Sequence, residues 1–387
     1  MESQGRKYRI LLLGDYSNMH SQLGKTLSAM GHDVTVMSDG CGFMDTSRTV
    51  DIRRRPGRLG GALLYARLRW PLHSRLSGYD IVAIQHPNFV QLRTGRLRIL
   101  FDRLRADNGR VFLTAAGTDP VYIRECQRAD SPLLYNEFRV GNRPTAFALS
   151  QSADLDSWLS PGMIDYTEHV YSHVDGVVTA LYEYDVAVRR LLGDSKVHYG
   201  GIPIDTGAVT PVPMDFGSGK TRIFLGRHAH RVVEKGTDIL EQAARRVCER
   251  HPDSAELVIV ENRPYAEYVQ LMRSSHIVLD QLYSYTPATN ALLAMAAGMV
   301  AVSGGEEDYY RFIGECGETP GAGSPVLRPI VNARPDDLEA LVAELSQLVC
   351  DHDRLRASGA QGPEFVKRHN DAYVVAQRFL QAWTKTS

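Results

Sequence analysis

Three fixed positive charges, Arg227, Arg231 and Lys235, lie close together in one loop of the chain. Arginine presents a planar fork of N–H donors and lysine a compact point charge, and the two together suit the oxygens of a diphosphate. His228 and His230 lie in the same loop. These residue types predict an anion-binding site, and the alternative is a solvated loop whose cations only keep the surface soluble.

The residues on either side of this loop predict how the charges are positioned. The apolar run at 223–225 predicts a buried strand that ends at Gly226, and the pattern at 238–250 predicts a helix with Thr237 as its N-cap. Open α/β sheets bind ligands at the carboxyl ends of their strands, and a helix N-terminus adds backbone N–H donors for an anion. The three cations are therefore expected at one edge of a sheet.

Length and composition indicate the class of protein. A chain of 387 residues exceeds one ordinary core and predicts two domains. Its 43% hydrophobic and 23% charged residues are typical of a globular protein, and no apolar run reaches the roughly 20 residues that span a bilayer. The N-terminus resembles a first strand more than a secretory signal. The five cysteines show no CxxC pair, which predicts neither a disulfide framework nor a zinc site and favours the cytoplasm: Cys41, Cys126, Cys248, Cys316 and Cys350.

Apolar runs and helical patterns alternate along both halves of the chain. Strands are predicted at 8–13, 33–37, 81–84, 111–114 and 176–180, and again at 222–225, 256–260, 277–282 and 300–302. Residues 120–170 show no regular pattern, and the turn-rich stretch 199–219 predicts a hinge. The expected architecture is an α/β protein with two Rossmann-like domains facing across a cleft. Its predicted parts are residues 1–207, residues 208–366, and a C-terminal helix in 367–387 that returns to the first domain.

Positive charge is concentrated at 46–110, which contains fourteen Arg, four Asp, no Lys and no Glu. Leucines and Trp70 are interleaved with the densest arginines. This mixture is consistent with peripheral contact with an anionic membrane or with a phosphorylated acceptor. The alternative is an Arg-rich solvated helix, and a nucleic-acid partner is not expected because no recognised binding motif accompanies the charge.

Taken in order, several short motifs resemble the GT-B glycosyltransferases, specifically the family 4-like group. The motifs extend over most of the chain and comprise residues 31–34, 113–119, 174–177, 201–205, 226–238 and 290–305. The resemblance implies a nucleotide sugar bound mainly on the second domain and an acceptor on the first. It also implies transfer of a sugar with retention at the anomeric carbon.

The resemblance assigns expected roles to particular residues of the second domain. Donor binding is expected from Arg227, Arg231, Lys235, Tyr285, Thr289, Asn290 and Glu306. Arg227 and Lys235 are also expected catalytic residues, because charge develops on the departing diphosphate. For Tyr285 the alternative is packing under the loop, and for Glu306 it is an exposed acidic turn.

Other candidates come from the first domain. Asp119 is expected to act in catalysis as a carboxylate that orients a hydroxyl group. Residues expected on the acceptor side are Asp15, Ser17, Asn18, His20, His86, Gly117 and Thr118. The alternatives are turn formation by the 15–18 loop and structural roles for the two histidines.

The chain departs from the family pattern at three positions. Two glutamates that members commonly carry eight positions apart are replaced by Tyr285 and Leu293, and a frequent histidine is replaced by Ala116. Front-face transfer, in which the donor phosphate helps to deprotonate the acceptor, requires no protein nucleophile. The departures leave two alternatives open: a catalytically degenerate protein that binds a nucleotide or glycan, or a GT-B nucleotide-sugar epimerase.

Partners and cofactors follow from the same resemblance. The expected partners are a nucleotide-sugar donor and a glycan or lipid-linked acceptor. No cofactor and no metal are expected, since Arg and Lys take the role of the metal and His228 and His230 do not complete a ligand set. The expected location is the cytoplasm, or the inner face of the membrane.

Overall fold

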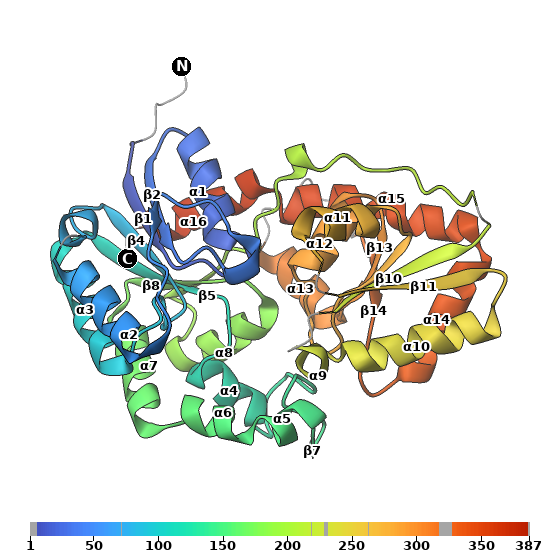
Figure 1. Cartoon of the computed structure of the whole chain (residues 1–387), viewed down its shortest axis with the longest axis horizontal. Helices are drawn as coiled ribbons and strands as arrows, with labels where there is room; N and C mark the ends of the chain where they lie inside the picture. Colours follow the sequence, from blue (N-terminus) through green and yellow to red (C-terminus); the bar gives the residue numbers. More distant parts are fainter. Residues whose placement is uncertain are drawn as a thin grey trace. The chain divides into compact units, whose positions relative to one another are not determined.

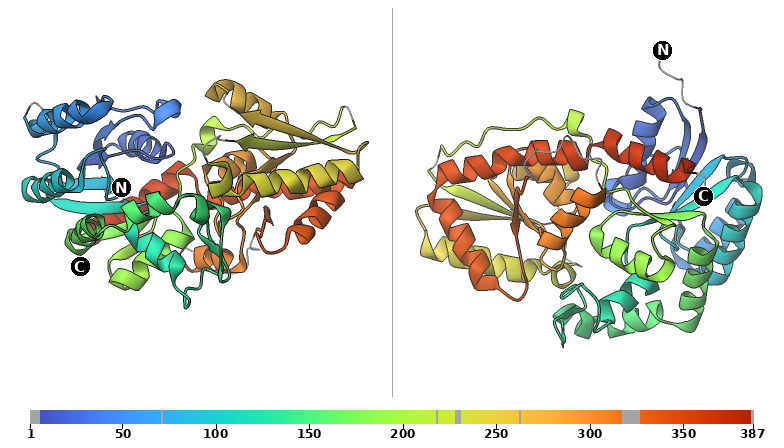
Figure 2. Two further views of the ribbon diagram at one scale, coloured as in Figure 1. Left: turned by 60° about the horizontal axis from the view of Figure 1, so that its bottom comes forward. Right: turned by 180° about the vertical axis from the view of Figure 1, so that it is seen from behind.

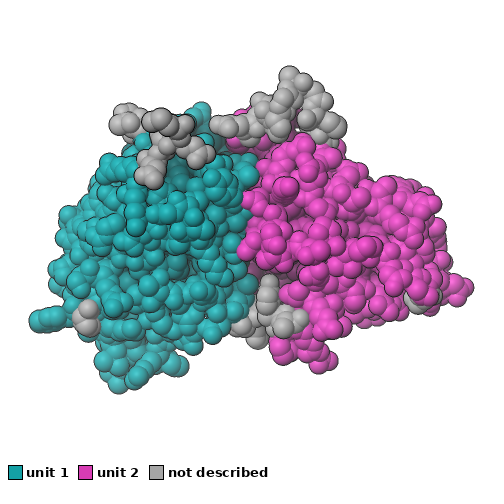
Figure 3. Space-filling model, turned by 90° about the horizontal axis from the view of Figure 1, so that it is seen from above, with its two compact units in different colours: residues 1–125, 153–203, 372–387 teal, residues 126–152, 204–371 magenta. Residues whose placement is uncertain are grey.

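The protein divides into two compact units (Figure 3). The computed structural model describes residues 6–70, 72–217, 219–227, 231–261, 263–316 and 327–385. Unit 1 consists of Met1–Glu125, Ala153–Pro203 and Ala372–Ser387, and unit 2 of Cys126–Ser152 and Ile204–Asp371. The sequence analysis placed its first boundary at 207/208 and kept 126–152 in the first domain, whereas this segment packs within unit 2.

Unit 1 is built on a parallel sheet of seven strands in the order β3-β2-β1-β4-β5-β8-β9. The strands are β1 (Arg9–Leu13), β2 (Asp33–Ser38), β3 (Val50–Asp51), β4 (Ile81–Gln85), β5 (Arg110–Ala115), β8 (Gly176–Thr179) and β9 (Val197–Tyr199). The helices are α1 (Met19–Ala29), α2 (Gly57–Arg69), α3 (Thr94–Asp107), α4 (Pro120–Gln127), α6 (Ser152–Trp158), α7 (Pro161–His173), α8 (Tyr182–Leu192) and α16 (Ala372–Thr384). Ile10 to Leu13 of β1 are buried throughout, as expected for a central parallel strand covered on both faces.

Unit 2 is built on a second parallel sheet, of five strands in the order β11-β10-β12-β13-β14. The strands are β10 (Thr221–Arg227), β11 (Ala255–Glu261), β12 (Ile277–Leu279), β13 (Val300–Ser303) and β14 (Ile330–Asn332). The helices are α9 (Val232–Lys235), α10 (Thr237–Arg250), α11 (Tyr265–Arg273), α12 (Thr289–Ala296), α13 (Glu307–Cys316), α14 (Leu338–Cys350) and α15 (His352–His369). The segment 126–152 adds a hairpin of β6 (Arg139–Val140) and β7 (Arg143–Pro144), followed by α5 (Ala146–Ser150). Two Rossmann-like parallel sheets confirm the predicted fold class (Figure 1).

Successive side chains along the strands of unit 2 point to opposite faces of the sheet, so its core has two parts, one on each face. Ile223 and Leu225 belong to the cluster that includes residues of α10 and α14. Phe224, between them, belongs to the cluster that includes Met272 of α11 and Ala294 of α12. The period of two thus places helices against both faces.

The C-terminal helix α16 belongs to unit 1, as the predicted fold class required (Figure 2). Its fully buried Trp383 lies against Phe112 of β5 and Phe379, with ring centroids 6.3 and 5.4 Å apart. Arg110 donates a hydrogen bond of 2.7 Å to the Trp383 carbonyl. The chain end is therefore anchored to the sheet of the first unit.

Several helices were not predicted, among them α3 and α13. Residues 120–170 were expected to be irregular, but they contain α4, α6 and α7 as well as the hairpin and α5. Helix α15 includes Gly359, Gly362 and Pro363, which usually indicate a turn. Here the glycines allow close packing, since a Cβ on Gly362 would lie 2.6 Å from the carbonyl oxygen of Met295 in α12. In the described part of the chain, no helix is both long enough and apolar enough to cross a bilayer.

Candidate functional site

Arg227 ends β10 at the carboxyl edge of the second sheet. Its Nη1 donates to Glu241 of α10 at 2.6 Å, and its Nη2 to Glu261 of β11 at 3.4 Å. Against the effect of burial, hydrogen bonds and charges from Arg245 and Arg227 hold the pKa of Glu241 below its ordinary value, so this carboxylate is ionised. The Nε of Arg227 is buried and has no acceptor within the described residues. The two carboxylates thus hold the guanidinium in position.

Lys235 ends the short helix α9 and reaches a neighbouring strand end. Its Nζ lies 3.7 Å from Oδ1 of Asp280, the residue that follows β12. Because Leu225 of β10 pairs with Leu279 of β12, Asp280 stands level with the end of β10. Asp280 is buried, and its other oxygen accepts a hydrogen bond of 3.1 Å from Ser303. Lys235 is therefore held at the carboxyl edge of the sheet, as predicted.

The third predicted cation, Arg231, precedes α9 and is about half exposed. Its Nε donates to Glu234 at 2.8 Å. His228 and His230 lie outside the described residues. Thr237 was expected to cap α10, and this is wrong: Gly236 occupies the N-cap with φ 66°, and the Thr237 hydroxyl donates to the carbonyl of Val232. The reason is that α9 runs directly into α10, so the turn between them requires the left-handed backbone that glycine adopts most easily.

Helix α12 begins at Thr289 on the same edge of the sheet, and Asn290 follows in its first turn. The Asn290 side chain accepts a hydrogen bond of 2.9 Å from the Tyr268 hydroxyl. Tyr268 of α11 also covers Gly226, where a Cβ would come within 2.2 Å of its oxygen. Tyr268 thus links the end of β10 to the start of α12, a connection the sequence analysis did not identify.

Tyr285 and Glu306 share one network with the segment 126–152. The Tyr285 ring stacks on Tyr135 at 4.7 Å, and its hydroxyl accepts a hydrogen bond of 2.7 Å from the Leu134 N–H. Glu306 accepts hydrogen bonds of 2.9 Å from both the Tyr135 hydroxyl and Asn332. Burial raises the pKa of Tyr285 to about 12, so its hydroxyl stays neutral. Both predicted donor residues therefore hold this segment in unit 2.

Replacing Tyr135 by alanine should loosen the segment 126–152. Tyr135 is 2% exposed, so truncation removes a buried ring, its stacking on Tyr285 and its bond to Glu306, a loss of about 3 kcal/mol. Limited proteolysis with mass-spectrometric mapping should then show faster cleavage within 126–152. Leu134→Ala is the matched control, because that side chain is 61% exposed and only its backbone contacts Tyr285. Equal cleavage rates in wild type and Tyr135→Ala would contradict this anchoring role.

Leu293, at the position of the second family glutamate, packs against the apolar cluster of Phe224, Val278 and Ala294. A leucine side chain offers no hydrogen-bond acceptor to a ribose hydroxyl. Leu293, which departs from the family pattern, therefore has a packing role in the structure.

Among the described residues of unit 1, five that are not glycine adopt a left-handed backbone: Ser17, Asn18, Cys41, Asp45 and His86. All follow β1, β2 or β4 in the chain, at the carboxyl end of the strand. Such strained residues persist where the surroundings force them, and they often cluster at functional sites. The predicted acceptor residues Ser17 and Asn18 belong to this group, and the Ser17 N–H lies 3.2 Å from the Cys41 sulfur.

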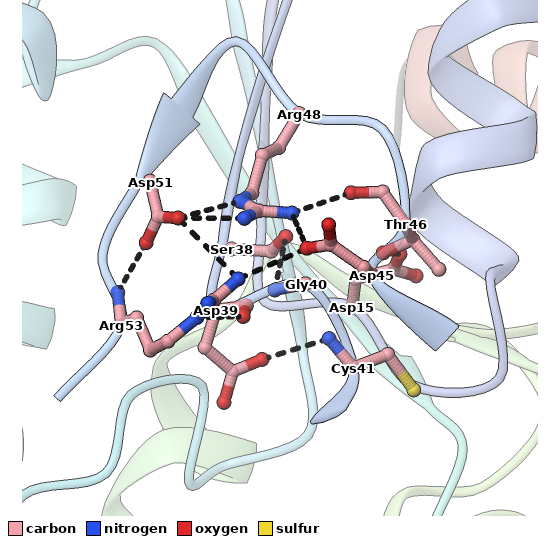
Figure 4. A network of polar contacts seen from close by, with 10 residues as sticks. All are labelled: Asp15, Ser38, Asp39, Gly40, Cys41, Asp45, Thr46, Arg48, Asp51 and Arg53. Atoms are coloured by element: carbon pink, nitrogen blue, oxygen red, sulfur yellow. Dashed lines mark hydrogen bonds and ion pairs between the residues drawn. The ribbon is translucent and has the colours of Figure 1, made fainter. Parts of the chain in front are cut away.

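A polar network holds the loop after β2 in place (Figure 4). Arg48 donates to Asp51 at 2.6 Å and to Asp45 at 2.9 Å, and Arg53 donates to Asp45 at 2.9 Å. The Thr46 hydroxyl donates to the buried Asp15 at 2.6 Å. Burial raises the pKa of Asp15, against the hydrogen bond from Thr46. Two arginines of the basic 46–110 region are therefore part of the framework of this loop.

His20 is fully buried and joins two strands of unit 1. Its Nδ1 contacts the carbonyl of Gly14 at 2.9 Å, and its Nε2 the hydroxyl of Thr114 at 3.1 Å. A carbonyl accepts only, so Nδ1 carries the proton and Nε2 accepts from threonine. Burial lowers the pKa of His20 to about 3, which keeps the imidazole neutral.

Acid should therefore destabilise unit 1 through His20. Its folded pKa is lowered, so its contribution to stability is complete above the ordinary value of 6.5 and is lost as the pH falls toward about 3. The loss amounts to about 1.4 kcal/mol per pH unit within that window. Urea midpoints across the window should fall less steeply for His20→Gln than for wild type. His173→Gln, at an exposed position of α7, should keep the wild-type slope, and an unchanged slope in His20→Gln would contradict this account.

His86, Gly117, Thr118 and Asp119 form one cluster at the ends of β4 and β5. The His86 Nδ1 accepts from the Asn88 N–H at 2.9 Å, so its Nε2 carries the proton and donates to the Thr118 carbonyl at 2.9 Å. Gly117 has φ 152° and leaves room for this ring, since a Cβ would lie 3.1 Å from it. Burial lowers the pKa of His86, partly opposed by the charge of Asp119.

Asp119 is buried at the start of α4. It accepts hydrogen bonds of 2.9 Å from the Tyr122 N–H and 2.8 Å from the Tyr171 hydroxyl of α7. Burial raises its pKa. This carboxylate thus belongs to unit 1, whereas Arg227 and Lys235 belong to unit 2.

The ion pairs between the cations and their acidic partners were not predicted from the sequence. Glu241, Glu261 and Asp280 each lie at least fourteen positions from the residue they hold. Glu241 and Glu261 are ordinary helix and strand-end residues in the sequence, so only the pairing of β10 with its neighbours reveals them. Among the residues that the structure describes, no group of three or more His, Cys, Asp or Glu side chains is arranged to hold a metal ion.

Comparison with known proteins places the chain among GT-B structures. Sucrose-phosphate synthase from Thermosynechococcus elongatus matches with TM-score 0.62 and 13% identity over 98% of both chains. An alpha-glucosyltransferase in complex with UDP and a DNA 13-mer matches with TM-score 0.58 and 12% identity, over 98% of this chain and 100% of that one. A UDP-N-acetylglucosamine 2-epimerase described as putative, from Listeria monocytogenes, matches with TM-score 0.54 and 12% identity, over 97% of this chain and 96% of that one. No protein-family model and no curated protein sequence matches the chain. The chain therefore has the GT-B glycosyltransferase fold.

Proposed function

We propose that the protein is a glycosyltransferase that moves a sugar from a nucleotide-activated donor to an acceptor hydroxyl group. The observation that carries the proposal is the gathering of Arg227, Lys235 and the α12 N-terminus at one edge of the second sheet. A diphosphate needs several N–H donors and positive charge, and this edge supplies both.

In this proposal the cations act on the leaving group. As the bond between the anomeric carbon and the diphosphate oxygen breaks, negative charge develops on the nucleoside diphosphate. Arg227 and Lys235, with Arg231, would stabilise that charge, and Glu241, Glu261 and Asp280 hold two of them in position. The acceptor oxygen would bond to the anomeric carbon on the face from which the diphosphate leaves, and its proton would pass to a phosphate oxygen of the donor, so the configuration at that carbon is retained. No metal or cofactor takes part, because the fixed cations supply the charge.

The acceptor would bind at the strand ends of unit 1. The strained backbone at Ser17, Asn18 and His86 supports a binding role for these loops. A glycan or a lipid-linked sugar offers hydroxyl groups that the Gly117–Thr118 turn would orient. Asp15, His20 and Asp119 would act indirectly, because all three are buried and hold the loops that carry these positions.

Two other functions each rest on one observation. Leu293 in place of a ribose-binding glutamate favours a protein that binds a nucleotide without transfer. The likeness to the epimerase structure favours inversion at C2 of a UDP-sugar.

One experiment separates the three functions. The protein is incubated with UDP-, GDP- and ADP-sugars, with and without a panel of glycan and glycolipid acceptors, and the products are followed by chromatography and NMR. Release of nucleoside diphosphate together with a glycosylated acceptor is the expected result. Calorimetric binding without any product would favour the binding protein, and a changed C2 signal in the donor would favour the epimerase.

A further inference from the structure

Helix α2 of unit 1 exposes an apolar stripe. Leu59, Leu63 and Trp70 are 80%, 58% and 88% exposed, although each is a large apolar side chain. Leu59, Leu63 and the exposed Ala66 are spaced by four and three positions, so they lie on one face of α2. Trp70, the C-cap residue of α2, follows Ala66 by four positions and continues the stripe. The opposite face is buried and consists of Gly60, Gly61, Leu64 and Leu68.

Arginines flank this stripe on both sides. With 3.6 residues per turn, Arg58 and Arg69 fall on one flank of the stripe and Arg67 on the other. All three are exposed, and the described residues show no ion pair between any of them and a carboxylate. Arg48 and Arg53, in contrast, pair with carboxylates in the network of Figure 4.

The surroundings of α2 contain little negative charge. Residues 52–79 include seven arginines and neither Asp nor Glu. The helix lies beside α3, where another cation, Arg96, approaches the Tyr65 ring at 5.1 Å (Figure 1). The surface therefore has an apolar stripe at its centre and positive charge around it.

We propose that α2 docks on an anionic lipid surface through this face, which is here called the α2 stripe: Arg58, Leu59, Leu63, Ala66, Arg67, Arg69 and Trp70. Trp70 and the leucines would enter the boundary between headgroups and acyl chains, where an indole ring is favoured. The arginines would contact lipid phosphates on either side. The inference does not depend on the proposed transferase activity, since it concerns a surface and is tested without any sugar.

Other occupants fit this surface less well. A second copy of the chain would bring the same positive charge against it, which is unfavourable. A nucleic acid would neutralise the arginines but leave the leucines and the indole against phosphates and solvent. A bilayer with anionic headgroups satisfies both the charge and the apolar stripe.

Vesicle sedimentation tests the proposal. The full-length protein should sediment with vesicles of phosphatidylcholine mixed equally with phosphatidylglycerol, far more than with phosphatidylcholine alone, and salt should reduce this binding. Arg58→Gln/Arg67→Gln/Arg69→Gln should weaken it by roughly 100-fold, and Leu59→Ser/Leu63→Ser/Trp70→Ser by at least about 10-fold. These side chains are exposed, so both variants should keep the wild-type circular dichroism spectrum.

A matched control and a second readout sharpen the result. Leu191→Ser, at an exposed leucine of α8, should bind vesicles like wild type. Anionic vesicles should shift the tryptophan fluorescence of the wild type to the blue, and Trp70→Phe should abolish this shift. Any of three results would overturn the proposal. These are failure to sediment with anionic vesicles, full binding by either triple variant, and binding to a DNA duplex but not to vesicles.

Discussion

Replacing Arg227 or Lys235 by alanine should weaken the binding of a nucleoside diphosphate by roughly 10- to 100-fold. Each change removes a charge-assisted hydrogen bond, which is worth about 1.5–3 kcal/mol. Calorimetry with UDP and with GDP measures the effect, and the nucleotide that the wild type binds more tightly should be used for the variants. Turnover should fall by more than affinity, because the charge on the leaving diphosphate is largest in the transition state.

Loss of either cation also affects a carboxylate, and the design must separate the two effects. Lys235→Ala leaves the buried Asp280 without its positive partner, a change that destabilises a protein by several kcal/mol. Lys235→Ala/Asp280→Asn should recover stability but not nucleotide binding. Such a double variant distinguishes a ligand contact from a structural one.

Arg245→Ala is the matched control for Arg227→Ala. Arg245 donates to the same carboxylate, Glu241, at 2.9 Å, but it lies along α10, one turn farther from the strand ends. Its loss should leave nucleotide affinity within about 2-fold of wild type. Unchanged affinity in both Arg227→Ala and Lys235→Ala, or an equal loss in Arg245→Ala, would place the diphosphate elsewhere.

Trp383→Ala should destabilise unit 1 by about 3–5 kcal/mol, the usual cost of truncating a buried indole. The side chain is 1% exposed and packs between Phe112 of the central sheet and Phe379 of its own helix. Its removal would leave a cavity where α16 meets β5, and the last helix of the chain would detach more readily. Urea unfolding followed by circular dichroism measures the loss.

Tyr373→Ala serves as the control in the same helix. Tyr373 is 53% exposed, so its truncation should change the free energy of unfolding by no more than about 0.5 kcal/mol. Trp383→Phe should fall between the two, because it keeps most of the apolar volume. A Trp383→Ala protein as stable as Tyr373→Ala would show that α16 contributes little to unit 1.

From the sequence alone, the two parallel sheets, several of the helices and the cations of the β10–α10 loop could be predicted. These features depend on local rules: buried parallel strands form continuous apolar runs, and helices repeat their apolar positions every three to four residues. The same rules failed at α15, where Gly362 packs closely against Met295 of α12 and Gly359 against the backbone of Gly298, just beyond that helix. Local patterns cannot distinguish a glycine that ends a helix from one that admits a neighbour.

The groups that hold the cations and the position of the segment 126–152 could be seen only in the folded chain. Glu261 reaches Arg227 because β11 is the neighbour of β10, and Asp280 reaches Lys235 because β12 is the other neighbour. Tyr135 contacts Glu306 across 171 positions of the chain. Such pairings depend on strand order and on which surface a loop covers, and these are properties of the whole packed chain. For the same reason the neutral state of His20 follows from its burial in the core, which its neighbours in sequence do not reveal.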